Sequence, residues 1–352
     1  MPARPDVSGF PVTSFLRGMK AFLPSMGLAL LLTQLSARPQ SIETLPAGRN
    51  TSLRGLSVVD DRVAWVSGSR GSVGRSTNGG RTWTWLAVPG FETSDFRDIE
   101  AWDERTAVVM AVAEPAWILR TDDGGIHWKV VHTDTTRGVF LDAMHFRRDG
   151  HGICVGDPIG SRLYELRTTD SGRSWTKTPA LRSPILEDGE AFFASSGSNT
   201  VLLADGRRLA VTGGRRSRLI DEDIITELPL RQGGTSTGAN SLAAYGHGRK
   251  LIVVGGDFSK DRDTSGTCAL SRNRGRSWHP PGKGLKGYRS SVVYLDRKQL
   301  LACGTSGVDL STDAGMHWKA VSREGFHVTA KAKKGRLVLL AGSGGRIGIY
   351  NP

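Results

Sequence analysis

Apolar and polar positions alternate in short runs along this chain. Residues 107–112, 251–254 and 337–340 are apolar stretches bounded by Gly, Asp or Asn, which is the length and the setting of β-strands. No long stretch repeats apolar residues at every third or fourth position, as an amphipathic helix would. The pattern therefore predicts an all-β fold built from many short strands.

One eight-residue phrase recurs five times between these runs. It reads Ser or Thr, any residue, Asp or Asn, any residue, Gly, any two residues, Trp. Such a phrase indicates a tight turn: the Asp or Asn side chain accepts nearby amides, Gly takes a positive φ, and Trp packs back on the sheet. We call each copy a turn box and expect it to be structural. The boxes span residues 76–83, 121–128, 168–175, 271–278 and 311–318, with Asn78, Asp123, Asp170, Asn273 and Asp313 at the third position and Trp83, Trp128, Trp175, Trp278 and Trp318 at the last.

The spacing of the turn boxes predicts the number of repeats. Their tryptophans lie 45, 47, 103 and 40 residues apart, so the long interval contains one repeat without a box. Periods of about 40 to 50 residues with strand patterning are typical of propeller blades. Residues 328–331, 337–341 and 346–350 add three strands after the last box, and residues 41–45 can supply a fourth. We predict a seven-bladed β-propeller of four-stranded antiparallel blades, closed by the N-terminal strand in the last blade. A six-bladed ring with a C-terminal extension is the alternative.

The chain divides into a leader and one domain. Residues 19–37 combine a basic start, an apolar stretch up to Leu35 and a small residue at Ala37, as in a secretory signal. We expect residues 1–37 to be this leader, residues 38–352 to be a single propeller, and the protein to be periplasmic or extracellular. An uncleaved N-terminal membrane anchor is the alternative. The expected blades span about residues 50–90, 91–135, 136–180, 185–232, 236–282, 286–322, and 325–352 together with 38–48.

The chain is strongly basic, with 47 Lys and Arg against 34 Asp and Glu and a net charge of +13. The excess is dispersed, as in residues 207–208, 215–216 and 331–334. Such charge attracts acidic proteins, anionic polysaccharide or anionic lipid headgroups, so peripheral membrane association is one possibility. A basic surface that has no specific partner explains the charge equally well. A nucleic-acid partner is not expected, because no binding motif is present. We expect a monomer that binds a protein or an anionic ligand in the cell envelope.

Cofactor and metal motifs are missing from the sequence. Cys154, Cys268 and Cys303 are the only cysteines, and they fit small core positions better than a ligand set. There is no Rossmann glycine fingerprint, no Cys-x-x-Cys pair and no haem attachment motif. We therefore expect no cofactor and no metal.

Candidate binding residues lie where each blade begins. The first strand of a propeller blade lines the central channel, and aligning the predicted first strands brings five polar residues to one position. An arginine cluster there would suit planar anions held by two hydrogen bonds, although any wet channel mouth also needs polar side chains. The residues expected to converge at one mouth are Arg54, Arg97, Asn240, Arg289 and His327, and the carboxylates Asp98, Asp142 and Glu190 follow one position later.

The turn boxes resemble the Asp-box, or BNR, repeat of sialidases and many unrelated propellers. Residues 63–83 look like a blade of the photosystem II stability and assembly factor family of seven-bladed propellers, and this likeness extends over about residues 50–350. The resemblance implies an exported, non-catalytic scaffold that binds a partner at its channel face.

The more distant sialidase resemblance implies an enzyme as the alternative, a glycoside hydrolase that uses paired acidic residues. That family carries an Arg-Ile-Pro motif near its N-terminus, whereas the one Arg-Ile pair here is Arg346-Ile347. The scaffold is therefore the preferred interpretation, with no catalytic residue. The alternative would use Arg54, Arg97 and Arg289 as an arginine triad, Asp98 or Asp142 as the acid, and Glu190 with Tyr288 as the nucleophile pair.

Overall fold

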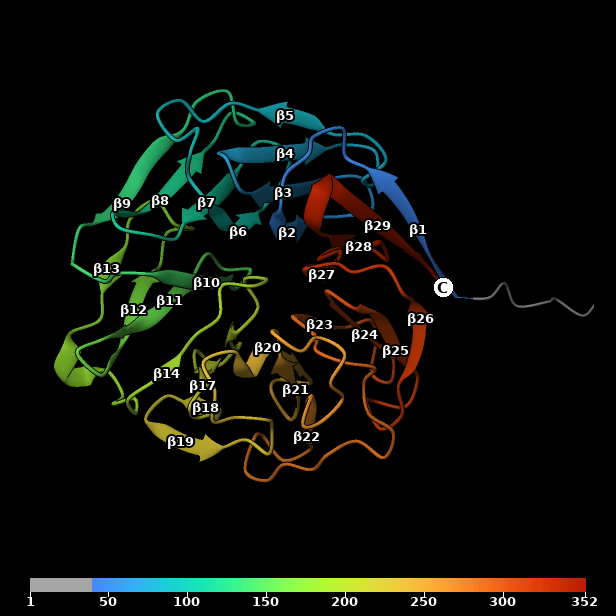
Figure 1. The fold of residues 1–352 in the computed structure, drawn as a ribbon. Helices are drawn as coiled ribbons and strands as arrows, with labels where there is room; N and C mark the ends of the chain where they lie inside the picture. The colour runs from blue at the N-terminus through green and yellow to red at the C-terminus, as the bar shows by residue number, and fades with distance from the viewer. Residues whose placement is uncertain (1–39) are drawn as a thin grey trace, which may run out of the picture. The chain divides into compact units, whose positions relative to one another are not determined.

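The computed structural model describes residues 40–352, and these form a ring of seven antiparallel sheets (Figure 1). In the first blade, β2 (Leu53–Val58), β3 (Ala64–Gly68), β4 (Ser72–Ser76) and β5 (Thr84–Leu86) succeed one another from the channel outward. The predicted all-β, seven-bladed propeller is confirmed. The expected leader, residues 1–37, lies outside the described residues.

Three further blades repeat this order without change. Blade two contains β6 (Phe96–Ala101), β7 (Ala107–Ala111), β8 (Ala116–Thr121) and β9 (Lys129–Asp134). Blade three contains β10 (Leu141–Phe146), β11 (Gly152–Ile159), β12 (Arg162–Thr168) and β13 (Thr176–Lys177). Blade six contains β23 (Ser291–Tyr294), β24 (Leu300–Gly304), β25 (Gly307–Ser311) and β26 (Lys319–Ser322).

Helices play almost no part in the described residues. The helical elements there are two three-residue 3-10 turns, η1 (Ala180–Arg182) and η2 (Ser343–Gly345). Within residues 40–352, no helix has the length and apolar character needed to cross a membrane.

The last blade closes the ring with a strand from the start of the described chain. It contains β27 (Val328–Lys331), β28 (Val338–Ala341), β29 (Arg346–Asn351) and, outermost, β1 (Ser41–Pro46). β1 pairs with β29 from Ser41 opposite Asn351 to Pro46 opposite Arg346, and Figure 1 shows the two strands side by side. The predicted closure is confirmed, and the alternative of a six-bladed ring is wrong.

The fourth and fifth blades depart from the regular pattern. Blade four contains β15 (Thr200–Leu202), β16 (Arg208–Val211), β18 (Arg218–Asp221) and β19 (Ile224–Glu227). Blade five contains β20 (Thr237–Tyr245), β21 (Lys250–Asp257) and β22 (Cys268–Ser271), and its fourth strand is reduced to one bridge between Leu270 and His279. β14 (Glu190–Ala191) and β17 (Gly213–Gly214) extend the sheet of blade five on its inner side.

The predicted first strand of blade four, residues 188–191, is therefore wrong. The chain makes only the short pairing of β14 with β17 there, and the inner strand of the blade begins at Thr200. The physical reason is that residues 192–199 leave the sheet and enter the channel, where their hydrogen-bond partners belong to other blades.

The turn boxes have the predicted internal hydrogen bonds. In blade three, Asp170 accepts the backbone amides of Arg173 at 2.9 Å and Ser174 at 3.0 Å, and Thr168 Oγ1 accepts the amide of Gly172 at 3.1 Å. Gly172 has a φ of +76°, which costs other residues conformational energy. The same side-chain acceptors recur in the other four boxes, so all five boxes form the same hydrogen-bonded turn.

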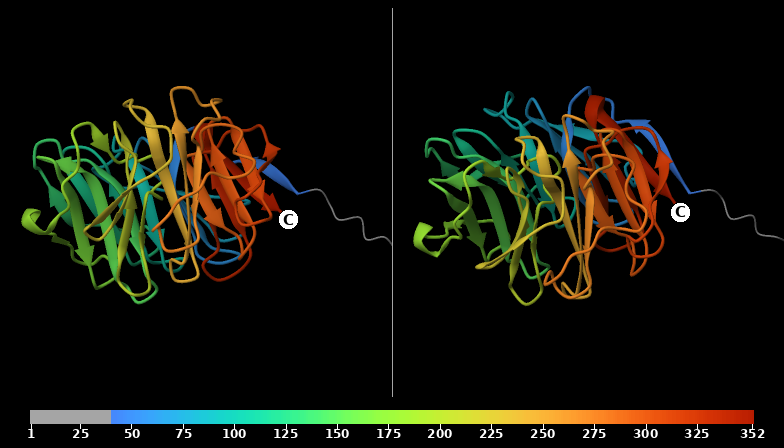
Figure 2. Two further views of the ribbon diagram at one scale, coloured as in Figure 1. Left: turned by 90° about the horizontal axis from the view of Figure 1, so that it is seen from below. Right: turned by 60° about the horizontal axis from the view of Figure 1, so that its bottom comes forward.

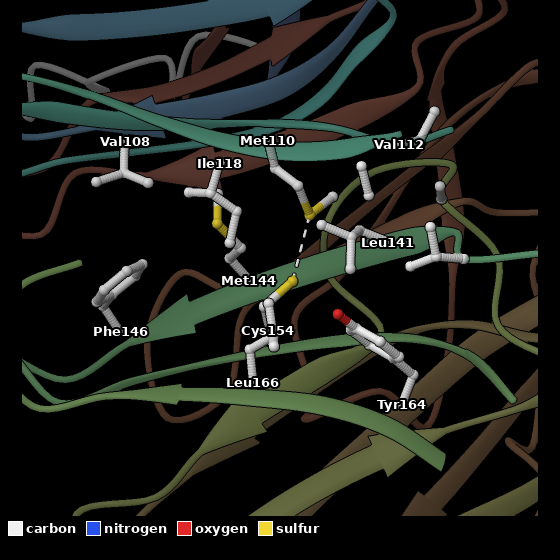
Figure 3. Close-up of a cluster of buried hydrophobic side chains, with 13 residues drawn as sticks. Val108, Met110, Val112, Ile118, Leu141, Met144, Phe146, Cys154, Tyr164 and Leu166 are labelled. Carbon is white, nitrogen blue, oxygen red and sulfur yellow. Dashed lines mark hydrogen bonds between the residues drawn. The ribbon is translucent and has the colours of Figure 1, made fainter. Parts of the chain in front are cut away.

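Each box tryptophan packs into the apolar core between its own blade and the preceding one. Figure 3 shows one such core, between blades two and three, where the thiol of Cys154 donates to Met110 Sδ at 3.4 Å. Trp175 packs against this core. All three cysteines are buried and free, as expected of core residues.

The seam between blades three and four lacks a box tryptophan. The turn from β18 to β19 is only two residues long there. At this seam Arg208 Nε lies 2.8 Å from Glu165 Oε2, and both side chains are 3% exposed. A buried ion pair therefore occupies the seam of the repeat that has lost its box.

Closure by β1 can be tested by truncation. A chain that begins at residue 49 loses all six β1–β29 residue pairs and the packing of Leu45 on the core shared by blades seven and one. We expect its melting temperature to fall by about 10 °C or more, measured by circular dichroism. A chain that begins at residue 40 is the matched control and should melt like the full chain. Equal melting temperatures for the two truncations would contradict closure by β1.

Candidate functional site

Residues 192–199, which we call the plug, cross the channel below one of its mouths. Plug atoms form hydrogen bonds with blades one, two, five and six, so the plug ties opposite sides of the ring together. Gly197 has a φ of +62°, and a Cβ on it would lie 2.3 Å from Asp98 Cγ, so only glycine fits there. The bonds are Arg54 Nη1 to Ser195 O (3.4 Å), Arg97 Nη1 to Ala194 O (3.0 Å), Ser195 Oγ to Asn240 Oδ1 (3.0 Å) and Ser196 Oγ to Ser290 O (2.6 Å).

Four first strands contain a register shift at the same level of the ring, and each shift coincides with a candidate site residue. An extra residue in one strand of a pair bends the strand and redirects its side chain. Arg54, Arg97 and Asn240 occupy such positions, which explains why they face the plug. Asp142 occupies the fourth, so its position is equivalent to those of Arg54 and Arg97. The sequence alignment, in contrast, predicts that Asp142 is equivalent to Asp98. The shifts lie between Leu53 and Gly55, Phe96 and Asp98, Leu141 and Ala143, and Ala239 and Ser241.

Above the plug lies a pocket of about 470 Å³, which we call the mouth pocket. Four of the five predicted binding residues line it: Arg54, Arg97, Asn240 and His327. Its wall also includes aromatic side chains. The rings of Phe193 and Phe258 stand edge to face at 5.5 Å, and Phe258 in turn lies 6.2 Å from Tyr288.

Arg289, the fifth predicted binding residue, does not reach the mouth pocket. Its side chain is 1% exposed, and Nη2 lies 2.6 Å from Asp309 Oδ2. The strand pairing of β23 with β24 contains no register shift that would redirect this side chain. The expectation that Arg289 joins the other arginines is wrong, and its ion pair with Asp309 is internal to blade six.

Arg54 forms no direct ion pair, and only the more distant charge of Asp95 offsets its own. Arg97 Nε lies 2.7 Å from Asp95 Oδ2, whereas Arg54 forms no ion pair with any carboxylate of residues 40–352. Burial, and next the positive charge of Arg97, lower the pKa of Arg54. An anionic group that enters the pocket would relieve the repulsion between the two guanidinium groups.

Two neutral side chains, Asn240 and His327, line the mouth pocket beside Arg54 and Arg97. Asn240 is fully buried, and its Oδ1 accepts the hydroxyl of Tyr288 at 2.8 Å. His327 Nδ1 lies 3.0 Å from Leu53 O, to which it can donate. Burial, assisted by the charge of Arg54, lowers the pKa of His327 to about 4, so this imidazole is neutral at pH 7. The mouth pocket is thus lined by two cations, by the carboxylate of Asp157 and by no histidine that titrates near pH 7.

Carboxylates lie beside and beneath the plug. Asp98 accepts the amides of Ile99 at 2.8 Å and Met144 at 2.6 Å, and burial raises its pKa well above the ordinary value. Burial likewise raises the pKa of Asp142, helped by Asp157 and opposed by Arg97. Asp157 accepts the amide of Phe192 at 2.8 Å, and burial raises its pKa to about 6. Asp157 therefore anchors the start of the plug.

The set of residues proposed for glycoside hydrolysis is not brought together. Glu190 is 3% exposed, lies outside the mouth pocket, and pairs with Arg218, whose Nε donates to it at 3.0 Å. Arg289 is bound to Asp309, and Asp98 and Asp142 do not line the pocket. In the part of the chain that the structure describes, no three His, Cys, Asp or Glu side chains converge as a metal site.

The plug and the aromatic residues Phe193 and Phe258 were not predicted. The one local signal is that the Ser-Ser-Gly-Ser run at 195–198 breaks the alternation expected of a first strand. That break indicates that residues 195–198 are not part of a regular strand, but it does not indicate where the chain goes.

Comparison with solved structures supports the fold. Structure matches include "YCF48 bound to D1 peptide" (TM-score 0.61, 16% identity, covering 90% of this chain and 98% of that one) and YCF48 from Cyanidioschyzon merolae (0.64, 15%, 89% and 99%). The WD40 propeller domain of Doa1 matches to a similar degree (0.62, 12%, 90% and 98%). No protein-family model matches the sequence, and no curated protein matches it. At these identities the likeness shows the propeller fold alone.

The raised pKa of Asp157 predicts how the site affects stability. Its pKa rises from 3.8 to about 6 on folding, so the folded state binds this proton more tightly. The carboxyl therefore destabilises the fold least below pH 4 and most above pH 6. Asp157→Asn keeps an oxygen for the amide of Phe192 and should raise the urea midpoint at pH 7.5 while changing it little at pH 4.

The matched control is Asp188→Asn, because the Asp188 side chain is 94% exposed. It should change the urea midpoint little at either pH. A midpoint for Asp157→Asn that is lowered equally at pH 4 and pH 7.5 would contradict the assigned pKa.

Proposed function

We propose that this chain is an exported, non-catalytic scaffold that binds a segment of a partner protein in the mouth pocket, as assembly and stability factors do. One observation carries the proposal. Arg54 and Arg97 converge above the plug, and Arg54 forms no direct ion pair among residues 40–352. A guanidinium without a direct ion pair favours an anionic group from outside.

The chemistry of the pocket favours a peptide segment with a carboxylate. Arginine binds carboxylates through two parallel hydrogen bonds. Phe193 and Phe258 offer an apolar wall beside the arginines, with Phe258 46% exposed. A volume of about 470 Å³ is of the size of small-ligand pockets, so it takes a few side chains and not a folded domain. The partner segment would therefore place one acidic and one apolar side chain in the pocket.

The structural neighbours support a protein partner. YCF48 has the same propeller fold and has been solved with a bound D1 peptide. This shows that such a propeller can bind a peptide. The proposal for this chain extends that behaviour to the arginines and aromatic side chains described above.

Two further parts of the proposal rest on the sequence. We include the turn boxes as Asp-box (BNR) repeats, because their hydrogen bonds match the turn that the motif requires. We include export to the cell envelope because residues 19–37 have the composition of a secretory signal. These residues lie outside the described part of the chain.

Removal of both arginines tests the proposal. The immobilised full chain is incubated with envelope extract of its host, and captured proteins are quantified by mass spectrometry. Arg54→Ala with Arg97→Ala should reduce capture of the specific partner about tenfold or more, because a buried charge-assisted pair is lost. Melting curves of the variant show whether it is folded.

The matched control is Arg105→Ala with Arg173→Ala, which changes the net charge equally on exposed turns of the opposite face. It should capture the partner like the unmodified chain. If no captured protein depends on Arg54 and Arg97 more than on the control pair, the mouth pocket is not the docking site.

A further inference from the structure

The face opposite the mouth pocket is formed by two sets of turns at one level of the ring. In each blade that has a turn box, an amide of the box donates to the turn between the first and second strands. Examples are Arg274 N to Arg249 O at 3.1 Å in blade five and Ala314 N to Lys298 O at 2.6 Å in blade six. Figure 2 shows the sheets from the side, with their turns gathered on two opposite faces. We call this surface the turn-box face.

Positive charge on the turn-box face is concentrated in blades five to seven. Of the exposed cations there that form no ion pair with a carboxylate of residues 40–352, six define this patch. The corresponding turns of blades one and two mix signs, as in residues 60–62 and 103–105. The six cations, which we call the basic crescent, are Arg249, Arg274, Arg276, Arg297, Lys298 and Lys334.

Few carboxylates lie close enough to the basic crescent to offset its positive charge. Asp296 accepts the amides of Lys298 and Gln299, each at 2.7 Å, and these bonds lower its pKa with help from neighbouring cations. The carboxylate of Asp313 already accepts the backbone amide of His317 and contacts the Nδ1 atom of its ring. Asp205 of blade four is also close to Arg274, but it pairs with Arg207. The crescent therefore keeps most of its charge free for an external anion.

A hollow of about 480 Å³ opens within the crescent, and its lining includes Tyr245, Arg297 and Lys298 together with Asp296, whose carboxylate is held by two backbone amides. Tyr245 is 36% exposed, and its ring lies 5.4 Å from that of Tyr294. Tyrosines are enriched at the level of lipid headgroups, where one end of the ring is apolar and the other is wet. A tyrosine framed by two cations therefore fits an anionic headgroup.

We propose that the basic crescent docks this propeller on a membrane surface that contains anionic lipids. A planar surface fits because the cations come from equivalent turns of successive blades and lie at one level. A protein partner fits less well, because protein interfaces have an apolar centre with few charges, and the crescent is mostly charged. Docking in this way directs the mouth pocket away from the lipid. This inference concerns the opposite face and does not depend on the proposed function of the pocket.

Vesicle flotation tests the proposal on the full chain. The probes are vesicles of phosphatidylcholine alone and vesicles in which about a third of the lipid is phosphatidylglycerol. Binding should require phosphatidylglycerol and should fall steeply between 0.1 M and 1 M salt, where the screening length shrinks from about 10 Å to about 3 Å. Each basic residue near an anionic surface contributes about fivefold in partitioning. Arg297→Ala with Lys298→Ala should therefore reduce partitioning about 25-fold.

The controls separate this face from the rest of the chain. Vesicles of phosphatidylcholine alone measure any binding that is independent of lipid charge, including that of the apolar residues 21–35. Arg105→Ala with Arg173→Ala removes two exposed cations from other turns of the same face and should leave partitioning within about twofold. Melting curves confirm that each variant is folded.

Three outcomes would overturn the proposal. Binding that does not depend on phosphatidylglycerol would exclude an electrostatic dock. Equal losses for the crescent pair and the control pair would show that only net charge matters. Retention on heparin without binding to phosphatidylglycerol vesicles would assign the crescent to a soluble polyanion instead.

Discussion

Pairing of β1 with β29 is the constraint on which the rest of the molecule depends. Because the last blade has only three strands of its own, the ring closes only when residues 41–46 add the fourth. Closure holds the first strands of all blades around one channel. Arg54 and Arg97, which lie on β2 and β6, can then meet the same plug. The mouth pocket is therefore a product of the closed ring and not of any single blade.

Within the closed ring, the mouth pocket is formed by local departures from regular strand geometry. Register shifts redirect Arg54, Arg97, Asp142 and Asn240 toward the channel. The first strand of blade four is shortened to Thr200–Leu202, and residues 192–199 before it enter the channel. The plug supplies carbonyl acceptors to the two arginines and takes an anchor from Asp157. The burial that raises the pKa of Asp157 comes from this same arrangement.

Much of the fold could be predicted from the sequence, because the turn boxes carry their own local hydrogen bonds. They indicated the blade count, the silent fourth repeat and the closing strand. The site was less accessible. Arg289 was misplaced because the presence or absence of a register shift depends on pairing with the next strand. The plug was missed because its bonds are to distant blades, and residues 192–199 have no local pattern that specifies those partners. The concentration of charge in blades five to seven likewise became visible only when equivalent turns could be compared.

A structure of this propeller with its captured partner segment bound would test the account most directly. The account predicts a carboxylate of the partner between the guanidinium groups of Arg54 and Arg97, with an apolar side chain against Phe193 and Phe258 and the plug in place beneath them. A partner bound to the outer strands of the blades or to the turn-box face, with the mouth pocket empty, would contradict it.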